Sequence, residues 1–374
     1  MRITGARVFT PEGTFEQRDI CMEDGLFVDE ASGETRDASG LMAIPGLLDV
    51  HFHGCMGEDF CNGTEAAIRT LASYEASQGV LAICPATMTY PEEKLDTIAD
   101  AAAAWVVAGA HPGCADLVGI NMEGPFISPN KVGAQNPAYV QAPDAAMFRR
   151  VQERSGGLFK LVTLAPEVDG ALEFVDELKD EVTVSVGHTC ATYDEAAAAF
   201  AHGAREVTHL WNAQPPLHHR DPAVIGAAAD YDHVCVELIC DGVHIHPAAI
   251  RATFKLFAGR VVMIADSMEA TGLEDGEYAL GGQKVYVQGN LATLESGTIA
   301  GSATNLFDCL RFAVLKARIP LAEAVTASTL TPARAIGVDD RYGSIECGKV
   351  ANLVLVDDEL NIHGIYLRGE ELAR

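Results

Sequence analysis

The feature that most constrains the fold is a recurring alternation between short apolar runs and amphipathic helical stretches. From residue 45 onward, runs rich in Val, Ile and Leu alternate with Ala- and Glu-rich segments, which is typical of βα units around a parallel sheet. Eight such runs occur, at residues 47–53, 80–86, 117–123, 159–165, 182–188, 206–209, 234–241 and 261–266. Because eight strands close a (β/α)8 barrel, the sequence predicts an α/β chain with a TIM barrel over residues 45–345. A doubly wound open sheet is the main alternative.

The two ends of the chain follow a different pattern. Residues 1–44 and 346–374 contain short alternating strands separated by turns. Segments from the two termini can pair because the termini of compact domains often lie close together. We therefore expect one small discontinuous β-sandwich domain, formed by both ends, beside the barrel.

Composition excludes several classes of partner. A net charge of −27 argues against nucleic acid or an anionic membrane, since both need a positive protein face. The N-terminal segment has no signal-peptide pattern, and no apolar run approaches the roughly 20 residues of a membrane span. Ten cysteines without a CxxC pair are expected to be reduced thiols. These features together predict a cytoplasmic protein with a small-molecule ligand.

Candidate metal ligands or bases stand where five of the eight runs end, and the other three runs end in Ala or Asp. The candidates are His51 with His53, Glu123, His188, His209 and Asp266. A single histidine at a strand end is usually structural, but the strands of a parallel barrel all end on one face, where such side chains can converge. This mixture of ligands suits zinc, iron, cobalt or manganese better than calcium. The sequence therefore predicts a metal site at that face.

Several segments resemble a known family, in order and over nearly the whole barrel. The segments PGLLDVHFHG, NMEGPFISP, VGHT, THLWNAQPPLHHR, ICDGVHIHP, IADSM and GTIAGSATNL resemble those of the N-acetylglucosamine-6-phosphate deacetylases of the amidohydrolase superfamily. The resemblance implies that Glu123, His188 and His209 bind the principal divalent metal, with zinc the first expectation. It also implies that His51 and His53 can hold a second ion. Asp266 would then be the catalytic acid and base.

The resemblance also implies a substrate-binding set. Asn212, Ala213, Arg220 and His244 would bind a 6-phosphate, and Arg suits this role because its planar fork can bind two phosphate oxygens. The sugar pocket would be lined by Ala134, Gln135, Asp241, Ile299, Ala300 and Gly301. Members of the family often carry His where this chain has Gln135, so the donor there is uncharged. In the family the equivalents of Arg220 and His244 reach across a dimer interface, so we expect a homodimer.

The implied reaction is hydrolysis of N-acetylglucosamine 6-phosphate to glucosamine 6-phosphate and acetate, in amino-sugar catabolism. A bound metal polarises the amide and lowers the pKa of water to about 7, while a carboxylate such as Asp266 accepts and returns the proton. The N-acetylgalactosamine epimer is an alternative substrate, because one hydrogen bond to the 4-hydroxyl could decide between them. A cyclic-amide hydrolase such as a dihydroorotase is disfavoured, since Lys160 lies near the start of the fourth run and Ala165 at its end. A non-catalytic sugar-phosphate-binding protein is disfavoured by the presence of Asp266 and the complete ligand set.

Overall fold

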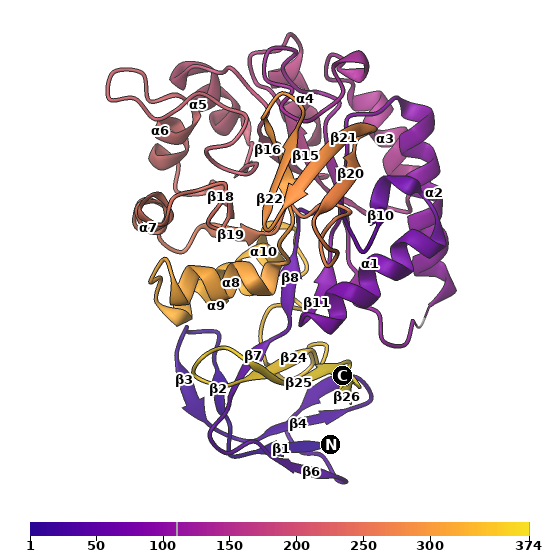
Figure 1. Ribbon diagram of the computed structural model, residues 1–374, viewed down its shortest axis with the longest axis vertical. Coiled ribbons are helices and arrows are strands. Elements are labelled where there is room, and N and C mark those ends of the chain that lie inside the picture. The colour runs from indigo at the N-terminus through magenta and orange to yellow at the C-terminus, as the bar shows by residue number, and fades with distance from the viewer. Residues whose placement is uncertain (110, 374) are drawn as a thin grey trace.

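The computed structural model describes residues 1–109 and 111–373, and its largest part is a barrel of parallel strands (Figure 1). The eight predicted strands are β8 (Leu47–Asp49), β11 (Val80–Ile83), β14 (Ile120–Glu123), β15 (Phe159–Leu164), β16 (Thr183–Val186), β17 (Glu206–Val207), β18 (Cys235–Ile239) and β19 (Val261–Ile264). Strands β14 to β19 pair in sequence order, and β8 pairs with β11. Two short segments connect these two sets of strands: β12 (Ala86–Thr87), which follows β11, pairs with β14, and β13 (Asp116–Leu117), which precedes β14, pairs with β11.

The barrel closes between its first and last strands. Just beyond β19, the Asp266 N–H donates a hydrogen bond of 2.9 Å to the His51 carbonyl, which follows β8. The predicted (β/α)8 barrel is therefore confirmed, and the open-sheet alternative was wrong. All four residues of β11, β14 and β19 are buried, as expected for strands packed between a barrel interior and an outer layer of helices.

Helices follow each barrel strand and form the outer layer. They are α1 (Glu65–Ser77), α2 (Glu92–Ala108), α3 (Ala145–Arg154), α4 (Ala171–Leu178), α5 (Tyr193–His202), α6 (Ala223–Asp230), α7 (Pro247–Leu256) and α8 (Leu306–Leu315), followed by α9 (Leu321–Ala327) and α10 (Leu330–Ala335). Local signals fix several starts: at α5, Thr192 and Glu195 form a reciprocal capping box. These helices hold the strand ends in place, and the strand ends carry the polar side chains.

The two chain ends meet in a separate β structure below the barrel, where Figure 1 places both termini. The N-terminal strands are β1 (Arg2–Thr4), β2 (Arg7–Phe9), β3 (Phe15–Gln17), β4 (Ile20–Glu23), β5 (Leu26–Val28), β6 (Thr35–Asp37) and β7 (Met42–Pro45), and the C-terminal ones are β24 (Leu353–Val356), β25 (Ile362–Leu367) and β26 (Glu370–Glu371). One sheet has the order β5-β4-β1-β6 and the other β26-β25-β24-β7-β2-β3. The antiparallel pairing of β24 with β7 confirms the discontinuous β-sandwich. Its exact boundaries at residues 44 and 345 stay a prediction.

A four-stranded antiparallel sheet is inserted between β19 and α8, and the sequence analysis did not anticipate it. Its strands are β20 (Gly276–Leu280), β21 (Gln283–Gln288), β22 (Leu291–Leu294) and β23 (Ile299–Ser302). The alternation of β21, in which Val285 and Val287 are buried and their neighbours are more exposed, is the period-2 signal of a strand with one face packed. This insert supplies Leu280, Ile299 and Gly301 to the cavity described below.

Two composition-based predictions can be compared with the structure. The ten cysteines form no disulfide among the described residues, and six of them are buried, so most are core side chains; that they are reduced stays a prediction. In the described part of the chain, no helix has the length and apolar character that crossing a membrane requires.

Glu75 on α1 is a buried carboxyl group that interacts with no ligand candidate. Its side chain is fully buried, and neither carboxyl oxygen has a hydrogen-bond partner in the part of the chain that the structure describes. Burial, with a smaller contribution from Asp49, raises the pKa of Glu75 well above its usual value. The folded protein therefore holds Glu75 as a neutral acid at pH values where the unfolded chain ionises.

We expect Glu75→Gln to remove a pH-dependent loss of stability. Because the folded-state pKa is raised, the stabilisation of the neutral acid is complete below about pH 4.5 and is lost as the pH rises through the folded pKa. In that window the free energy of unfolding of the variant, relative to that of the wild type, should increase by about 1.4 kcal/mol for each unit that the pH rises. Denaturant unfolding at several pH values between 5 and 8 tests this. Parallel pH profiles for the two proteins would contradict it, because a pH-independent offset reflects only burial of the amide.

Candidate metal centre and its cavity

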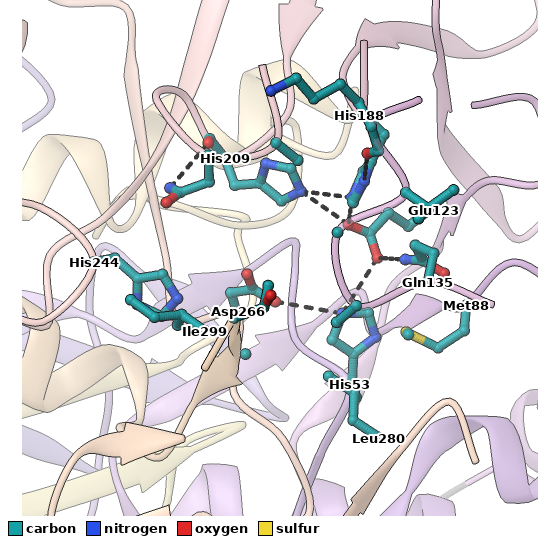
Figure 2. A pocket seen from close by; sticks show the side chains of 18 of the residues that line it. His53, Met88, Glu123, Gln135, His188, His209, His244, Asp266, Leu280 and Ile299 are labelled. Atoms are coloured by element: carbon teal, nitrogen blue, oxygen red, sulfur yellow. Dashed lines mark hydrogen bonds and ion pairs between the residues drawn. The ribbon is translucent and has the colours of Figure 1, made fainter. Parts of the chain in front are cut away.

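The six predicted metal-site residues converge at the carboxyl ends of the barrel strands. His51 and His53 follow β8, Glu123 ends β14, His188 follows β16, His209 follows β17 and Asp266 follows β19. Three of them have a left-handed backbone, with φ values of 47° at His188, 28° at His209 and 50° at Asp266. Non-glycine residues rarely adopt this conformation, and such strain is concentrated at functional sites. The strand ends are thus bent to direct these side chains inward (Figure 2).

One group of ligand atoms is formed by Glu123, His188 and His209. Oε1 of Glu123 lies 2.9 Å from Nε2 of His188 and 3.0 Å from Nε2 of His209. The two Nε2 atoms are themselves 3.0 Å apart, and all three side chains are buried. Two imidazole nitrogens and a carboxylate oxygen facing one point are a donor set suited to a divalent transition metal.

A second group is formed by His51, His53 and Asp266. Nε2 of His53 lies 3.3 Å from Oδ1 of Asp266 and 3.3 Å from Oε2 of Glu123. Nε2 of His51 lies 3.4 Å from Oε1 of Glu123, yet it is buried without a hydrogen-bond partner among the described residues. A buried ring nitrogen left without a partner in this way fits a metal ligand. Glu123 lies between the two groups.

The electrostatics keep the carboxylates ionised. Burial acts to raise the pKa of Glu123, but the charge of His51 and hydrogen bonds from His188 and His209 outweigh burial, so the pKa lies well below its usual value. For Asp266, burial is likewise outweighed, chiefly by the hydrogen bond from His53, and the pKa is lowered. Both groups are therefore anionic at neutral pH, the form that binds a cation or accepts a proton.

Contacts on the far side of the rings orient the ligand atoms, and two of these partners were missed by the sequence analysis. His51 Nδ1–H donates to Oε2 of Glu237 over 2.8 Å, and His188 Nδ1–H donates to the Lys131 carbonyl over 3.0 Å. The signal for Glu237 was present, since it is an acid within the apolar run 234–241. A backbone carbonyl such as that of Lys131 leaves no signal in sequence. Gln135, which was predicted for the sugar pocket, donates through Nε2 to Oε2 of Glu123 over 2.5 Å.

A cavity of about 500 Å³ opens above the ligand atoms. His53, Glu123, His188, His209 and Asp266 form part of its lining, as Figure 2 shows for their side chains. Seven of the predicted substrate residues line it as well: Ala134, Gln135, Asn212, Ala213, His244, Ile299 and Gly301. The volume is in the range of small-ligand pockets.

The other three predicted substrate residues lie outside the cavity lining. Ala300 is fully buried, and Asp241 is buried with Oδ2 accepting a 2.7 Å hydrogen bond from His244 Nδ1–H. Arg220 is exposed, and its guanidinium donates to His219 over 2.6 Å. Asp241 thus orients His244, whereas the role assigned to Arg220 depends on a second subunit and stays a prediction.

Comparison with known proteins places these features in a family. The chain matches the amidohydrolase family over residues 42–372. N-acetylglucosamine-6-phosphate deacetylase of Bacillus subtilis (strain 168) is 35% identical over 341 residues, which cover 90% of this chain and 86% of that protein. N-acetylgalactosamine-6-phosphate deacetylase of Escherichia coli O157:H7 is 33% identical over 369 residues, which cover 97% of each.

Solved structures agree with these relatives. A mutant N-acetyl-D-glucosamine-6-phosphate deacetylase from Mycobacterium smegmatis, in complex with N-acetyl-D-glucosamine-6-phosphate, superposes with a TM-score of 0.93 at 31% identity, covering 100% of this chain and 99% of that one. The N-acetylglucosamine-6-phosphate deacetylase from Thermotoga maritima gives a TM-score of 0.90 at 29% identity, covering 100% of both chains. The chain therefore belongs to the amidohydrolase family, in the group whose members are named as N-acetyl amino-sugar 6-phosphate deacetylases.

Proposed function

We propose that this protein hydrolyses the acetamide of N-acetylglucosamine 6-phosphate, releasing glucosamine 6-phosphate and acetate. The observation that carries the proposal is the convergence of two ligand groups, one of which contains Asp266, at one cavity. The names of the relatives support the substrate. A cytoplasmic location, expected from the sequence, belongs to the same proposal.

In this proposal the metal is zinc, with iron, cobalt and manganese as alternatives. Glu123, His188 and His209 hold the principal ion, and His51 and His53 hold a second beside Asp266. The donor atoms fit because they are buried and within 4.8 Å of one another in each group. A divalent ion supplies Lewis acidity, which polarises an amide carbonyl and lowers the pKa of water.

Asp266 moves the proton. Its carboxylate is anionic and lines the cavity, so Oδ1 can accept a proton from the attacking water. The same oxygen then returns the proton to the sugar nitrogen as the C–N bond breaks, which converts a poor leaving group into an amine. Oδ1 lies 3.3 Å from Nε2 of His53, the nitrogen proposed to bind the second ion.

Recognition of the sugar phosphate is assigned to the rest of the lining. The side-chain amide of Asn212, the backbone N–H of Ala213 and His244 bind the 6-phosphate. Ile299 and Gly301 of the inserted sheet enclose the sugar. The side-chain amide of Asn212 donates a hydrogen bond of 3.1 Å to the His209 carbonyl, which fixes the conformation of this side chain. In the expected homodimer, Arg220 of the second copy would add a guanidinium to this site, whereas His244, which was also expected to reach across the interface, lines the cavity of its own subunit.

Lys131 is expected to supply positive charge to the phosphate end within one subunit. Among the described residues lining the cavity, it is the one lysine or arginine. Its loop lies beside the proposed phosphate donors, because a Cβ at Gly133 would be 3.7 Å from that of Ala213. A local cation matters in a chain of net charge −27, since close contacts outweigh the screened overall field.

We expect Lys131→Met to raise KM for N-acetylglucosamine 6-phosphate about 10- to 100-fold, as for a lost charged hydrogen bond, with kcat unchanged. The carbonyl that orients His188 remains in the variant. Steady-state acetate release measures both constants, and Lys131→Arg should retain a near-normal KM. An unchanged KM in the Met variant would remove Lys131 from phosphate binding.

The galacto epimer is a second candidate substrate. The relative named for it aligns over 97% of this chain, and epimers that differ at one hydroxyl are separated by single hydrogen bonds. Acetate release from both 6-phosphates by metal-loaded protein tests the proposal. Turnover of the gluco compound with higher kcat/KM supports it, and preference for the galacto compound reassigns the substrate. No turnover of either by protein with verified metal would reject the deacetylase function.

A further inference from the structure

Glu237 on β18 is a fully buried acid that contacts both proposed ligand groups without belonging to either. One of its oxygens, Oε2, accepts a 2.8 Å hydrogen bond from Nδ1–H of His51 and a 2.9 Å hydrogen bond from the backbone N–H of His209. Its carbonyl accepts the next N–H, that of Leu210, over 2.9 Å. Glu237 thus fixes both the ring of His51, after the first barrel strand, and the turn at His209, after the sixth barrel strand.

The contact with His51 determines which ring nitrogen can bind a metal. A carboxylate oxygen only accepts hydrogen bonds, so Nδ1 must carry the hydrogen. In the neutral ring the lone pair is then on Nε2, which lies 3.4 Å from Oε1 of Glu123. A carboxylate behind a ligating histidine also raises its basicity. The contact with His209 is different, because it reaches only the backbone and stabilises the left-handed turn at φ 28°.

We propose that Glu237 is the positioning residue that makes the His51 position a metal site, so that its charge governs whether a second ion is retained. The inference rests on the proposed metal centre of the deacetylase. Glu237 affects the two histidines differently. Its charge acts on the ring of His51, whereas its contact with His209 needs only an acceptor for the backbone N–H and no charge. Glu237→Gln keeps an acceptor oxygen of the same shape and removes the charge.

Glu206 provides a matched control on the neighbouring strand β17. It is as completely buried as Glu237, and both of its carboxyl oxygens lack hydrogen-bond partners in the described ranges. Burial and the nearby charge of Glu237 raise the pKa of Glu206 well above its usual value. Glu206→Gln therefore replaces a neutral acid at the same depth, without removing a charge or breaking a hydrogen bond to a ligand candidate. Any general effect of losing a buried acid should appear equally in both variants.

The experiment is titration of the metal-depleted full chain with Co²⁺ against a competing chelator, following the visible absorption of bound cobalt. We expect wild type to bind two equivalents of Co²⁺ with different affinities. Glu237→Gln should lower the affinity for the more weakly bound ion about 10- to 100-fold, with loss of the absorption bands of that ion. Glu206→Gln should bind both as wild type does. Thermal unfolding of the metal-free proteins checks that Glu237→Gln folds, and a second variant, Glu237→Asp, should retain more affinity than Gln if charge is the cause.

Three results would overturn the inference in distinguishable ways. If Glu237→Gln binds both equivalents like wild type, or loses no more than Glu206→Gln, Glu237 has no positioning role although the deacetylase proposal stands. A wild type that binds a single equivalent rejects a second ion at His51 and leaves a one-metal deacetylase. A wild type that binds no metal rejects the metal centre itself.

Discussion

Asp266→Asn should lower kcat for N-acetylglucosamine 6-phosphate by about 10³- to 10⁴-fold, the upper range for loss of a general acid and base. Asn has the shape of Asp but cannot accept and return a proton, so both attack on the carbonyl and departure of the amine are impaired. KM should change little, because the residues proposed to bind the sugar and phosphate are untouched. The measurement is steady-state acetate release with the metal content of each sample determined.

The metal analysis separates the two roles that the geometry allows Asp266. Oδ1 lies 3.3 Å from His53 Nε2, so the substitution could also lower metal occupancy. Activity should stay low in samples whose metal content equals that of wild type. A fully loaded variant whose kcat is within about tenfold of wild type would contradict the proton-transfer role, since the expected effect is much larger.

Glu123→Gln should abolish tight metal binding and reduce kcat/KM by more than about 10³-fold, because metal catalysis supplies several kcal/mol. The oxygens of Glu123 lie within 3.4 Å of Nε2 of all four histidines, namely His51, His53, His188 and His209. A neutral amide lacks the charge that balances a dication and directs N–H groups toward the ligand nitrogens. Metal content after dialysis and acetate release at saturating metal are the two measurements.

Glu206→Gln is the appropriate control for Glu123→Gln, because among the described residues the carboxyl group of Glu206 makes no hydrogen bond to a ligand candidate. It should retain both metal and activity. If Glu123→Gln keeps its metal after dialysis, the principal site cannot contain Glu123 and the ligand assignment fails. If it loses metal yet turns over substrate at the wild-type rate, the reaction does not need the ion.

The barrel and the convergence of the ligand residues could be predicted from sequence because both depend on simple geometry. Parallel strands end at one face, so His51 and Asp266, which are far apart in the chain, could be placed together from strand order alone. Most of the cavity lining followed from the quoted motifs. The exposed position of Arg220 could not be derived, since a loop conformation depends on contacts beyond its own residues.

Other features were outside the reach of sequence reasoning. Glu237 was visible as an acid in an apolar run, but its partners, His51 Nδ1 and the His209 N–H, follow from register between strands. The inserted sheet of residues 276–302 has short alternating strands, which were hidden by the expectation that a barrel strand is followed by a helix. Ile299 and Gly301 of this sheet were predicted to line the sugar pocket because of the family resemblance, and not because a sheet was recognised in the sequence.

The seam where the barrel closes coincides with the second ligand group. His51 and Asp266 follow the first and last barrel strands, and the N–H of Asp266 donates a hydrogen bond to the carbonyl of His51 across that seam. An ion held by His51, His53 and Asp266 would therefore cross-link the ends of two strands that are more than 200 residues apart in the chain. Loading of the catalytic centre and closure of the barrel would then be thermodynamically linked, so that the ion needed for chemistry also protects the scaffold from unfolding.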